Sequence, residues 1–118
     1  MNTELTEASP QVFAPQWTTA GPAETAVLDV DIRGAQPFAW VRGEIDILSA
    51  PWLLEELERL MQRHGARLVL DLSGVTFMDC SGINMLLAAR RRAQFKGGLL
   101  RVISPSASVR RVISLAGL

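Results

Sequence analysis

Hydrophobic positions along most of the chain recur at spacings that predict strands and helices in alternation. The loosely alternating Thr25–Arg33 and the apolar Phe38–Arg42 flank a turn at Gly34–Pro37, so we expect them to pair as a hairpin. Arg67–Leu72 and Leu99–Ile103 have the length and apolar character of two further strands. Arg67–Leu72 is almost continuously apolar, which is typical of a strand covered on both faces.

Three stretches have apolar residues at helical spacing. The first begins at Ser49, which we expect to be the N-cap, and ends at His64 in a last turn that favours positive charge. The second runs from about Ser81 to Phe95, and the third follows Ser104-Pro105-Ser106. The order strand, strand, helix, strand, helix, strand, helix predicts an α/β fold, with helices packed on a mixed, mostly parallel sheet of four to five strands.

The N-terminal residues 1–24 contain three prolines and show no sustained periodicity. We therefore expect a disordered N-terminal tail before a single domain at residues 25–118. Phe13 and Trp17 are the aromatic residues of this tail. They either contact nothing, or dock on the domain or on a partner.

Composition excludes several classes of protein. A chain of 118 residues fits one domain, and no apolar run reaches the length of about 20 residues that spans a bilayer. The N-terminus is polar and acidic, unlike a signal peptide, so we expect a cytoplasmic protein without a membrane partner. One cysteine excludes an internal disulfide, and one cysteine with one histidine leaves too few ligands for a typical zinc site. We expect no cofactor.

The net charge is zero, but the two halves of the chain differ in sign. Residues 1–60 hold ten acids and three bases, a formal charge of −7, whereas residues 61–118 hold nine bases and two acids, a formal charge of +7. This polarity either orients a protein partner or reflects two complementary surfaces within the fold. The acidic half argues against a dedicated nucleic-acid-binding protein.

Candidate chemistry is concentrated in Val75–Ile83, between a predicted strand and a predicted helix. An acid (Asp79), a thiol (Cys80), a hydroxyl (Ser81) and a glycine (Gly82) stand together there. The first amides of a helix lack internal partners and the helix dipole favours negative charge, so a hydroxyl in this place is well sited to carry a phosphate. The same residue types also form ordinary N-caps.

Three motifs in order make the sequence similar to a known family. The matching segments are Gly43-Glu44-Ile45-Asp46 with Ala50-Pro51, the run Leu70–Ile83, and Gly97-Gly98 with Ser104-Pro105, Val109-Arg110-Arg111 and the terminal Leu115–Leu118. They resemble the motifs of the STAS domain, specifically its bacterial anti-sigma factor antagonist branch, over about residues 25–118. Three motifs in order are far more specific than any one of them.

This resemblance implies a regulatory binding protein without its own catalysis. Such antagonists bind an anti-sigma factor, often a serine kinase of the histidine-kinase-like ATPase type, and so free a sigma factor for transcription. The kinase phosphorylates the serine directly after the motif aspartate, and a PP2C-type phosphatase reverses the reaction. A phosphate adds about −1.5 to −2 charge, which beside Asp79 would repel an acidic partner surface and break the interface.

This chain departs from the family pattern at that acceptor position. Cys80 stands where the family has its serine, and Ser81 follows it. Four interpretations remain. Ser81 takes the phosphate in a shifted geometry; the domain is not phosphorylated and binds its partner constitutively; Cys80 senses oxidants, since a helix N-terminus lowers a thiol pKa; or Cys80 is a small, partly buried residue without chemistry.

The resemblance also suggests a partner surface, for which we expect nine residues: Asp79, Cys80, Ser81, Gly82, Ile83, Asn84, Glu44, Asp46 and Ser49. Asp79 would cap and orient the loop, and Gly82 would let a partner's backbone approach. Arg90–Arg92 either contact the rim of an acidic partner or only complement the helix dipole.

Two other classes of function compete with this expectation. The first is a STAS module that senses a small ligand or nucleotide, without sigma-factor control. The second is an enzyme, which the sequence supports least, because its only histidine, His64, falls in the last turn of the first helix and no base stands beside Cys80 or Ser81.

Overall fold

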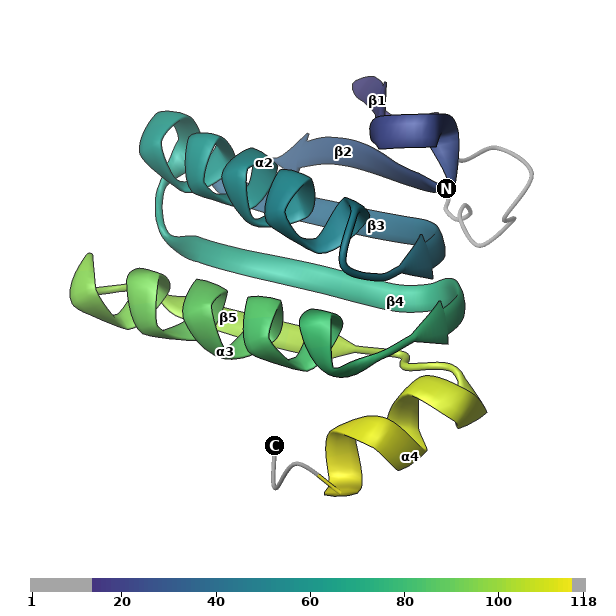
Figure 1. The fold of residues 1–118 in the computed structure, drawn as a ribbon. Helices are drawn as coiled ribbons and strands as arrows, with labels where there is room; N and C mark the ends of the chain where they lie inside the picture. Colours follow the sequence, from purple (N-terminus) through teal and green to yellow (C-terminus); the bar gives the residue numbers. More distant parts are fainter. Residues whose placement is uncertain (1–13, 116–118) are drawn as a thin grey trace, which may run out of the picture.

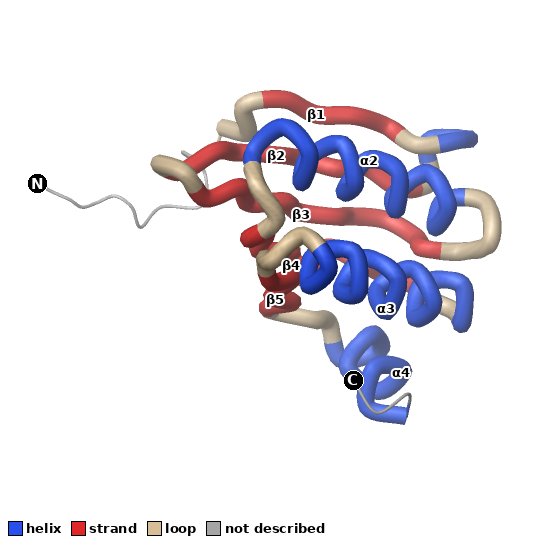
Figure 2. Tube along the Cα trace, turned by 90° about the vertical axis from the view of Figure 1, so that its left-hand side faces the viewer, coloured by secondary structure: helices blue, strands red, loops and turns tan. Residues whose placement is uncertain are grey.

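The computed structural model describes residues 14–115 as a five-stranded mixed sheet with helices α2 and α3 side by side over one face (Figures 1 and 2). The strands lie in chain order from β1 to β5. The elements are β1 (Trp17–Ala20), the 3-10 helix η2 (Pro22–Glu24), β2 (Ala26–Arg33), β3 (Gln36–Ile45), α2 (Ser49–His64), β4 (Arg67–Met78), α3 (Cys80–Phe95), β5 (Leu99–Ile103) and α4 (Ala107–Leu115).

The α/β fold class and the mixed sheet predicted from the sequence are confirmed. β2 and β3 form the expected hairpin, in which Arg33 pairs with Gln36 across a two-residue turn. The connections through α2 and α3 make β3–β4 and β4–β5 parallel, as such crossovers require. The additional strand β1 brings the antiparallel pairings to two, equal to the parallel ones, so the sheet is mixed but not mostly parallel as predicted.

Strand β1 corrects the prediction of a disordered tail over residues 1–24. Residues 1–13 lie outside the described residues, but Trp17–Ala20 pair with β2 along the edge of the sheet. The sequence offers only Trp17-Thr18-Thr19 as β-forming residues, which is too short a run to show a period of two. The pairing depends on contacts with β2 and α2, which no local pattern reveals.

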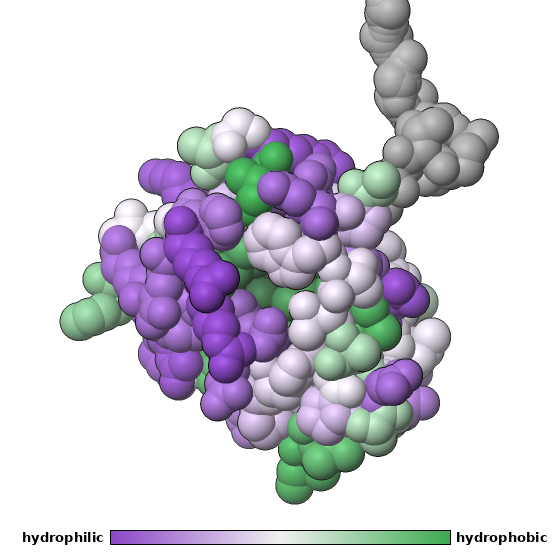
Figure 3. Space-filling model, turned by 90° about the horizontal axis from the view of Figure 1, so that it is seen from above, coloured by the Kyte–Doolittle hydropathy of each residue, from purple (hydrophilic) through white to green (hydrophobic). Residues whose placement is uncertain are grey.

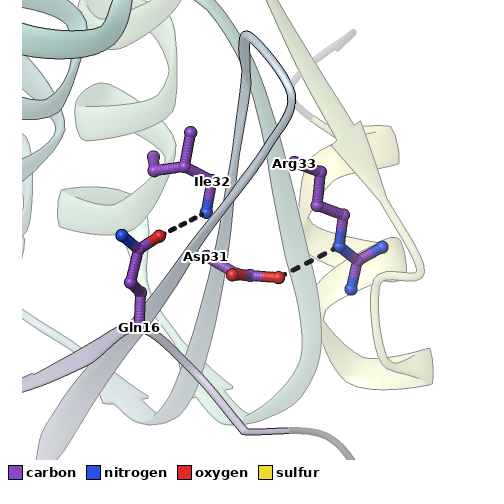
Figure 4. Close-up of polar contacts among 4 residues, drawn as sticks. All are labelled: Gln16, Asp31, Ile32 and Arg33. Carbon is purple, nitrogen blue, oxygen red and sulfur yellow. Dashed lines mark hydrogen bonds and ion pairs between the residues drawn. The ribbon is translucent and has the colours of Figure 1, made fainter.

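Side chains attach β1 to its neighbours in three ways. The Thr18 hydroxyl donates to a carboxylate oxygen of the buried Asp29 at 2.7 Å. The Trp17 ring lies 5.8 Å from the His64 ring at the end of α2, so His64 contacts an aromatic residue of β1. Just before the strand, the Gln16 side-chain oxygen accepts a hydrogen bond from the Ile32 backbone amide at 3.1 Å (Figure 4).

The hydrophobic core lies between the sheet and the two helices. β4 contributes every second residue, and α2 contributes residues at helical spacing; the most buried of both sets are Leu68, Leu70, Leu72, Leu53 and Leu57. The prediction that Arg67–Leu72 is covered on both faces is wrong, because α2 and α3 cover the same face (Figure 2). Val69 on the other face is nevertheless buried, since its register partners, Phe38 and Arg101, have large side chains beside it.

Candidate functional site

Two turns lie side by side at the end of the sheet where the parallel strands β3 and β4 finish and α2 and α3 begin (Figure 1). Both strands are longer than the sequence pattern predicts, and they reach Ile45 and Met78, which are register partners. The Asp79 backbone amide donates to the Ile45 carbonyl at 3.3 Å, so the β3–α2 turn and the β4–α3 turn are joined by a hydrogen bond. The structure therefore brings together the two sequence segments in which we expect the partner surface.

The β3–α2 turn is held by Asp46 and Ser49. One carboxylate oxygen of Asp46 accepts hydrogen bonds from the backbone amides of Leu48 and Ser49, each at 3.0 Å. The Ser49 hydroxyl donates to the Glu44 carbonyl at 2.8 Å and accepts from the Asp46 amide at 3.0 Å. The expectation that Ser49 is the N-cap is wrong, because Ser49 is the first helical residue and Asp46 supplies the capping oxygen.

Hydrogen bonding also changes the acidity of Asp46. The backbone N–H of Ser49 holds the pKa of the Asp46 carboxyl below its usual value of 3.8. The Ser49 hydroxyl and the Leu48 amide act in the same direction, while desolvation opposes them. Asp46 is therefore a negative charge at the start of α2, where the helix dipole favours one.

The β4–α3 turn has fewer polar bonds. Asp79 is the N-cap of α3, and its carboxylate accepts from the Ser81 backbone amide at 2.8 Å, which confirms the capping interpretation of this stretch. The Cys80 side chain is exposed at the first helical position, one residue earlier than the expected helix start. Ser81 is half-buried and Asn84 is exposed.

Gly82 and Ile83 have internal packing roles. A Cβ on Gly82 would stand 2.2 Å from Cγ and 2.5 Å from Sδ of Met78, and 3.1 Å from Cγ2 of Ile45. Gly82 is buried, so its missing side chain makes room for this chain's own residues, and the expectation that it admits a partner's backbone is not supported. Ile83 belongs to the hydrophobic core.

The most exposed apolar residues of the site are two that the sequence analysis did not select. Ile47 has 80% and Leu48 has 53% of its surface exposed, and both lie in the β3–α2 turn beside Asp46. In the space-filling view, apolar side chains protrude from a mostly hydrophilic or neutral surface only at separate places (Figure 3). One signal in the sequence could have identified Ile47 and Leu48. They form an apolar pair just before α2 and do not continue the helical spacing of its buried residues.

A groove of about 470 Å³ runs between the first turns of α2 and α3. Nine residues line it: Ile47, Ala50, Pro51, Leu54, Ser81, Asn84, Met85, Ala88 and Arg91. Ser81 thus faces the space between the helices, which exposed Ile47 also lines, whereas Cys80 is not among the lining residues. We call this space the front groove.

Two further observations concern the kind of site. Within residues 14–115, no three His, Cys, Asp or Glu side chains stand close enough together to hold a metal ion. In the same part of the chain, no helix is both long and apolar enough to cross a membrane. The exposed and half-buried groups at the joined turns are an apolar pair, three carboxylates, a thiol, a hydroxyl and the Asn84 amide, which suit the recognition of a protein surface.

Comparison with known proteins assigns the chain to a family. A family model described as "Mlab, STAS domain" matches residues 28–118. The anti-sigma-B factor antagonist of Bacillus subtilis is 33% identical over 78 residues, which cover 66% of this chain and 71% of that protein. The anti-sigma-B factor antagonist of Listeria monocytogenes is 30% identical over 79 residues, covering 67% of this chain and 69% of that protein.

A solved structure gives the same result in three dimensions. An anti-sigma factor antagonist from Mycobacterium paratuberculosis matches with a TM-score of 0.71 at 27% identity, and the match covers 84% of this chain and 83% of the other. The family model covers well over half of the sequence. The chain therefore belongs to the STAS domain family.

Proposed function

We propose that this protein is an anti-sigma factor antagonist, a regulatory binding protein that engages an anti-sigma factor and so frees a sigma factor for transcription. The observation that carries the proposal is the joined pair of turns, with exposed Ile47 and Leu48 on one and exposed Cys80 on the other, in a chain related to proteins of that name. An apolar centre with a polar surround is the usual composition of a protein interface.

The proposed contact surface consists of the exposed and half-buried residues of the two turns. It comprises Glu44, Asp46, Ile47, Leu48, Asp79, Cys80, Ser81 and Asn84. Ser49, Gly82 and Ile83 support this surface from inside, because all three are buried. Two of the contact residues, Ile47 and Leu48, would bury most apolar area on binding and should contribute most to affinity.

We further propose that binding is not switched off by phosphorylation at position 80. A thiol is not a normal kinase acceptor, and the next hydroxyl, on Ser81, lies about 100° further around the helix. Ser81 also faces the front groove, beside Ile47. A kinase site shaped for an outward-facing residue at position 80 would therefore meet Cys80, while Ser81 points toward α2.

Phosphorylation of Ser81 is the competing hypothesis. The phosphate would stand close to Asp79, whose carboxylate already accepts from the Ser81 amide, so like charges would repel. Under this hypothesis the anti-sigma factor is a kinase of the histidine-kinase-like ATPase type, and a PP2C-type phosphatase removes the phosphate. Constitutive binding requires neither the kinase activity nor the phosphatase.

The first experiment captures partners with the tagged protein from a lysate of its own organism and identifies them by mass spectrometry. The wild-type protein should recover an anti-sigma factor, and the Ile47→Asp variant should recover at least tenfold less of it. Arg63→Asp is the matched control, since Arg63 is exposed on α2 outside the front groove. If the wild-type protein recovers no anti-sigma factor, the proposal fails. Calorimetry with nucleotides then tests the alternative that the protein senses a small ligand.

The second experiment incubates the captured partner with labelled ATP and three forms of the protein. If binding is constitutive, the wild type incorporates no phosphate and Cys80→Ser incorporates it. Incorporation by the wild type that Ser81→Ala abolishes would instead establish Ser81 as the acceptor.

A further inference from the structure

A second, larger groove continues between α2 and α3 toward the C-terminal end of α3. It measures about 860 Å³ and is lined by Glu58, Ala88, Arg91, Arg92, Gln94, Phe95 and Lys96. Ala88 and Arg91 line both this space and the front groove. The two spaces are therefore neighbours on the surface, separated by no more than these shared residues, and we call the second one the rear groove.

The rear groove has an excess of positive charge. Its lining holds three cations and one carboxylate, a formal charge of +2. Glu58 is shared, because Arg92 Nη1 lies 3.2 Å and Lys96 Nζ 3.4 Å from its two oxygens. Both cations are partly exposed, so their attraction to Glu58 is screened by water and an incoming carboxylate can share them. Glu58 comes from the acidic half of the sequence and the three cations from the basic half, so the two kinds of charge face each other here with an excess of positive charge.

The rear groove also has an unusually exposed aromatic residue. Phe95, the last residue of α3, has 94% of its surface exposed and stands between Gln94 and Lys96. Neither the core nor α4 covers it, and covering it would remove a large apolar area from water. Aromatic residues, phenylalanine among them, and arginine are both enriched in protein interfaces.

From these observations we propose that the rear groove binds an acidic segment of the anti-sigma factor, with an apolar side chain of that segment covering Phe95. The proposal rests on the proposed function and names the chemistry of the partner. Charge complementarity selects an acidic occupant, and the lining residues Ala88 and Arg91, which the two grooves share, place it next to the protein that contacts Ile47.

The test is photo-crosslinking of the full chain in cells of its own organism. The photoreactive residue p-benzoylphenylalanine is placed at the position of Phe95 in one protein, at that of Ile47 in a second, and at that of Arg63 as the control. Crosslinked peptides are identified by mass spectrometry. We expect the anti-sigma factor at the Phe95 and Ile47 positions, through a net-acidic peptide at Phe95, and none at Arg63.

The outcomes separate this inference from the proposed function. Crosslinking of the anti-sigma factor at Ile47 but not at Phe95 overturns the inference and leaves the proposed function intact. Attachment at Phe95 to a neutral or basic peptide, to a lipid, or to a second copy of this chain also overturns it. Absence of an anti-sigma factor at both positions overturns both proposals.

Charge reversal tests the electrostatic part directly. In the Phe95-labelled protein, Arg91→Glu with Lys96→Glu should lower the crosslinking yield at least tenfold, because the lining then carries three negative charges against one positive one. Arg63→Glu should leave the yield unchanged. A yield that the double reversal does not lower contradicts an acidic occupant.

Discussion

The two turns of the site have the same position in the fold and are fixed by different means. Each connects a parallel strand to a helix, and each has an aspartate whose side chain caps the helix. In the β3–α2 turn, hydrogen bonds to Asp46 and Ser49 fix the backbone, and Ile47 and Leu48 are pushed into solvent. In the β4–α3 turn, Asp79 accepts from one helix amide, and tight packing around Gly82 fixes the backbone.

This difference teaches which turn tolerates chemical change. A hydrogen-bonded turn with a buried hydroxyl loses stability when a polar group is removed. A turn fixed by packing tolerates changes at its exposed positions, such as Cys80, and rejects any added volume at Gly82. The first turn is suited to a fixed contact surface, and the second to a residue that varies or is modified.

The largest effect is expected from added volume in the packed turn. Gly82→Val should lower the free energy of unfolding by about 3 kcal/mol, because its Cβ would overlap Met78 and press on Ile45. Urea unfolding measures the change. Asn84→Val is the control on an exposed position of the same helix and should cost less than about 0.7 kcal/mol. Equal losses would mean that packing at Gly82 does not fix the turn.

The next effect is the loss of the buried hydroxyl in the other turn. Ser49→Ala leaves the Glu44 carbonyl and the Asp46 amide without their hydrogen-bond partner and should cost about 2 kcal/mol. Urea unfolding of Ser49→Ala and Ser81→Ala compares the two serines. A loss below 0.5 kcal/mol for Ser49→Ala would contradict the hydrogen-bonded description of this turn.

A smaller, pH-dependent effect is expected for Asp46→Asn. The folded-state pKa of Asp46 is lowered, so its carboxylate stabilises the fold above pH 3.8 and this contribution is lost as the pH falls through the folded-state pKa. The variant should unfold at lower urea concentration than the wild type at pH 7, and the difference should shrink below pH 3.8. Urea midpoints at pH 7 and pH 2.5 give the comparison; a constant difference would exclude the carboxylate charge as its cause.

The smallest effect is expected at the exposed Cys80 and the half-buried Ser81 of the β4–α3 turn. Cys80→Ser and Ser81→Ala should each change the free energy of unfolding by less than about 0.5 kcal/mol, because neither removes a core contact. The measurement is again urea unfolding. A loss comparable to that of Ser49→Ala would show that the two turns are equally constrained.

Helix α3 illustrates how far local sequence signals reach. Asp79 with a following helical pattern predicted a capped helix, and the structure differs by one residue at its start. The start of α2 was predicted less well, because Ser49 and Asp46 are both good caps and only the fold of the turn decides which oxygen faces the free amides.

The candidate site was only partly predicted, because here too the fold of the turns decides which residues are exposed. Its two segments were identified from their residues, but the sequence could not separate exposed from buried members. Ser49 has a small side chain and Gly82 has none, and such residues suit both a contact surface and a packed turn. Ile47 and Leu48 resemble core residues in composition, and their exposure depends on where the Asp46 turn directs them.

The sequence by itself determined the order of strands and helices, the hairpin, the parallel crossovers and the capped start of α3, because spacing and capping residues act over a few neighbours. Only the tertiary structure decided that Trp17–Ala20 form the edge strand, that one face of the sheet is covered by α2 and α3, and that Arg91 lines both the groove with Ser81 and the groove with Phe95. These features come from contacts between residues far apart in the chain, whose energies no local pattern encodes.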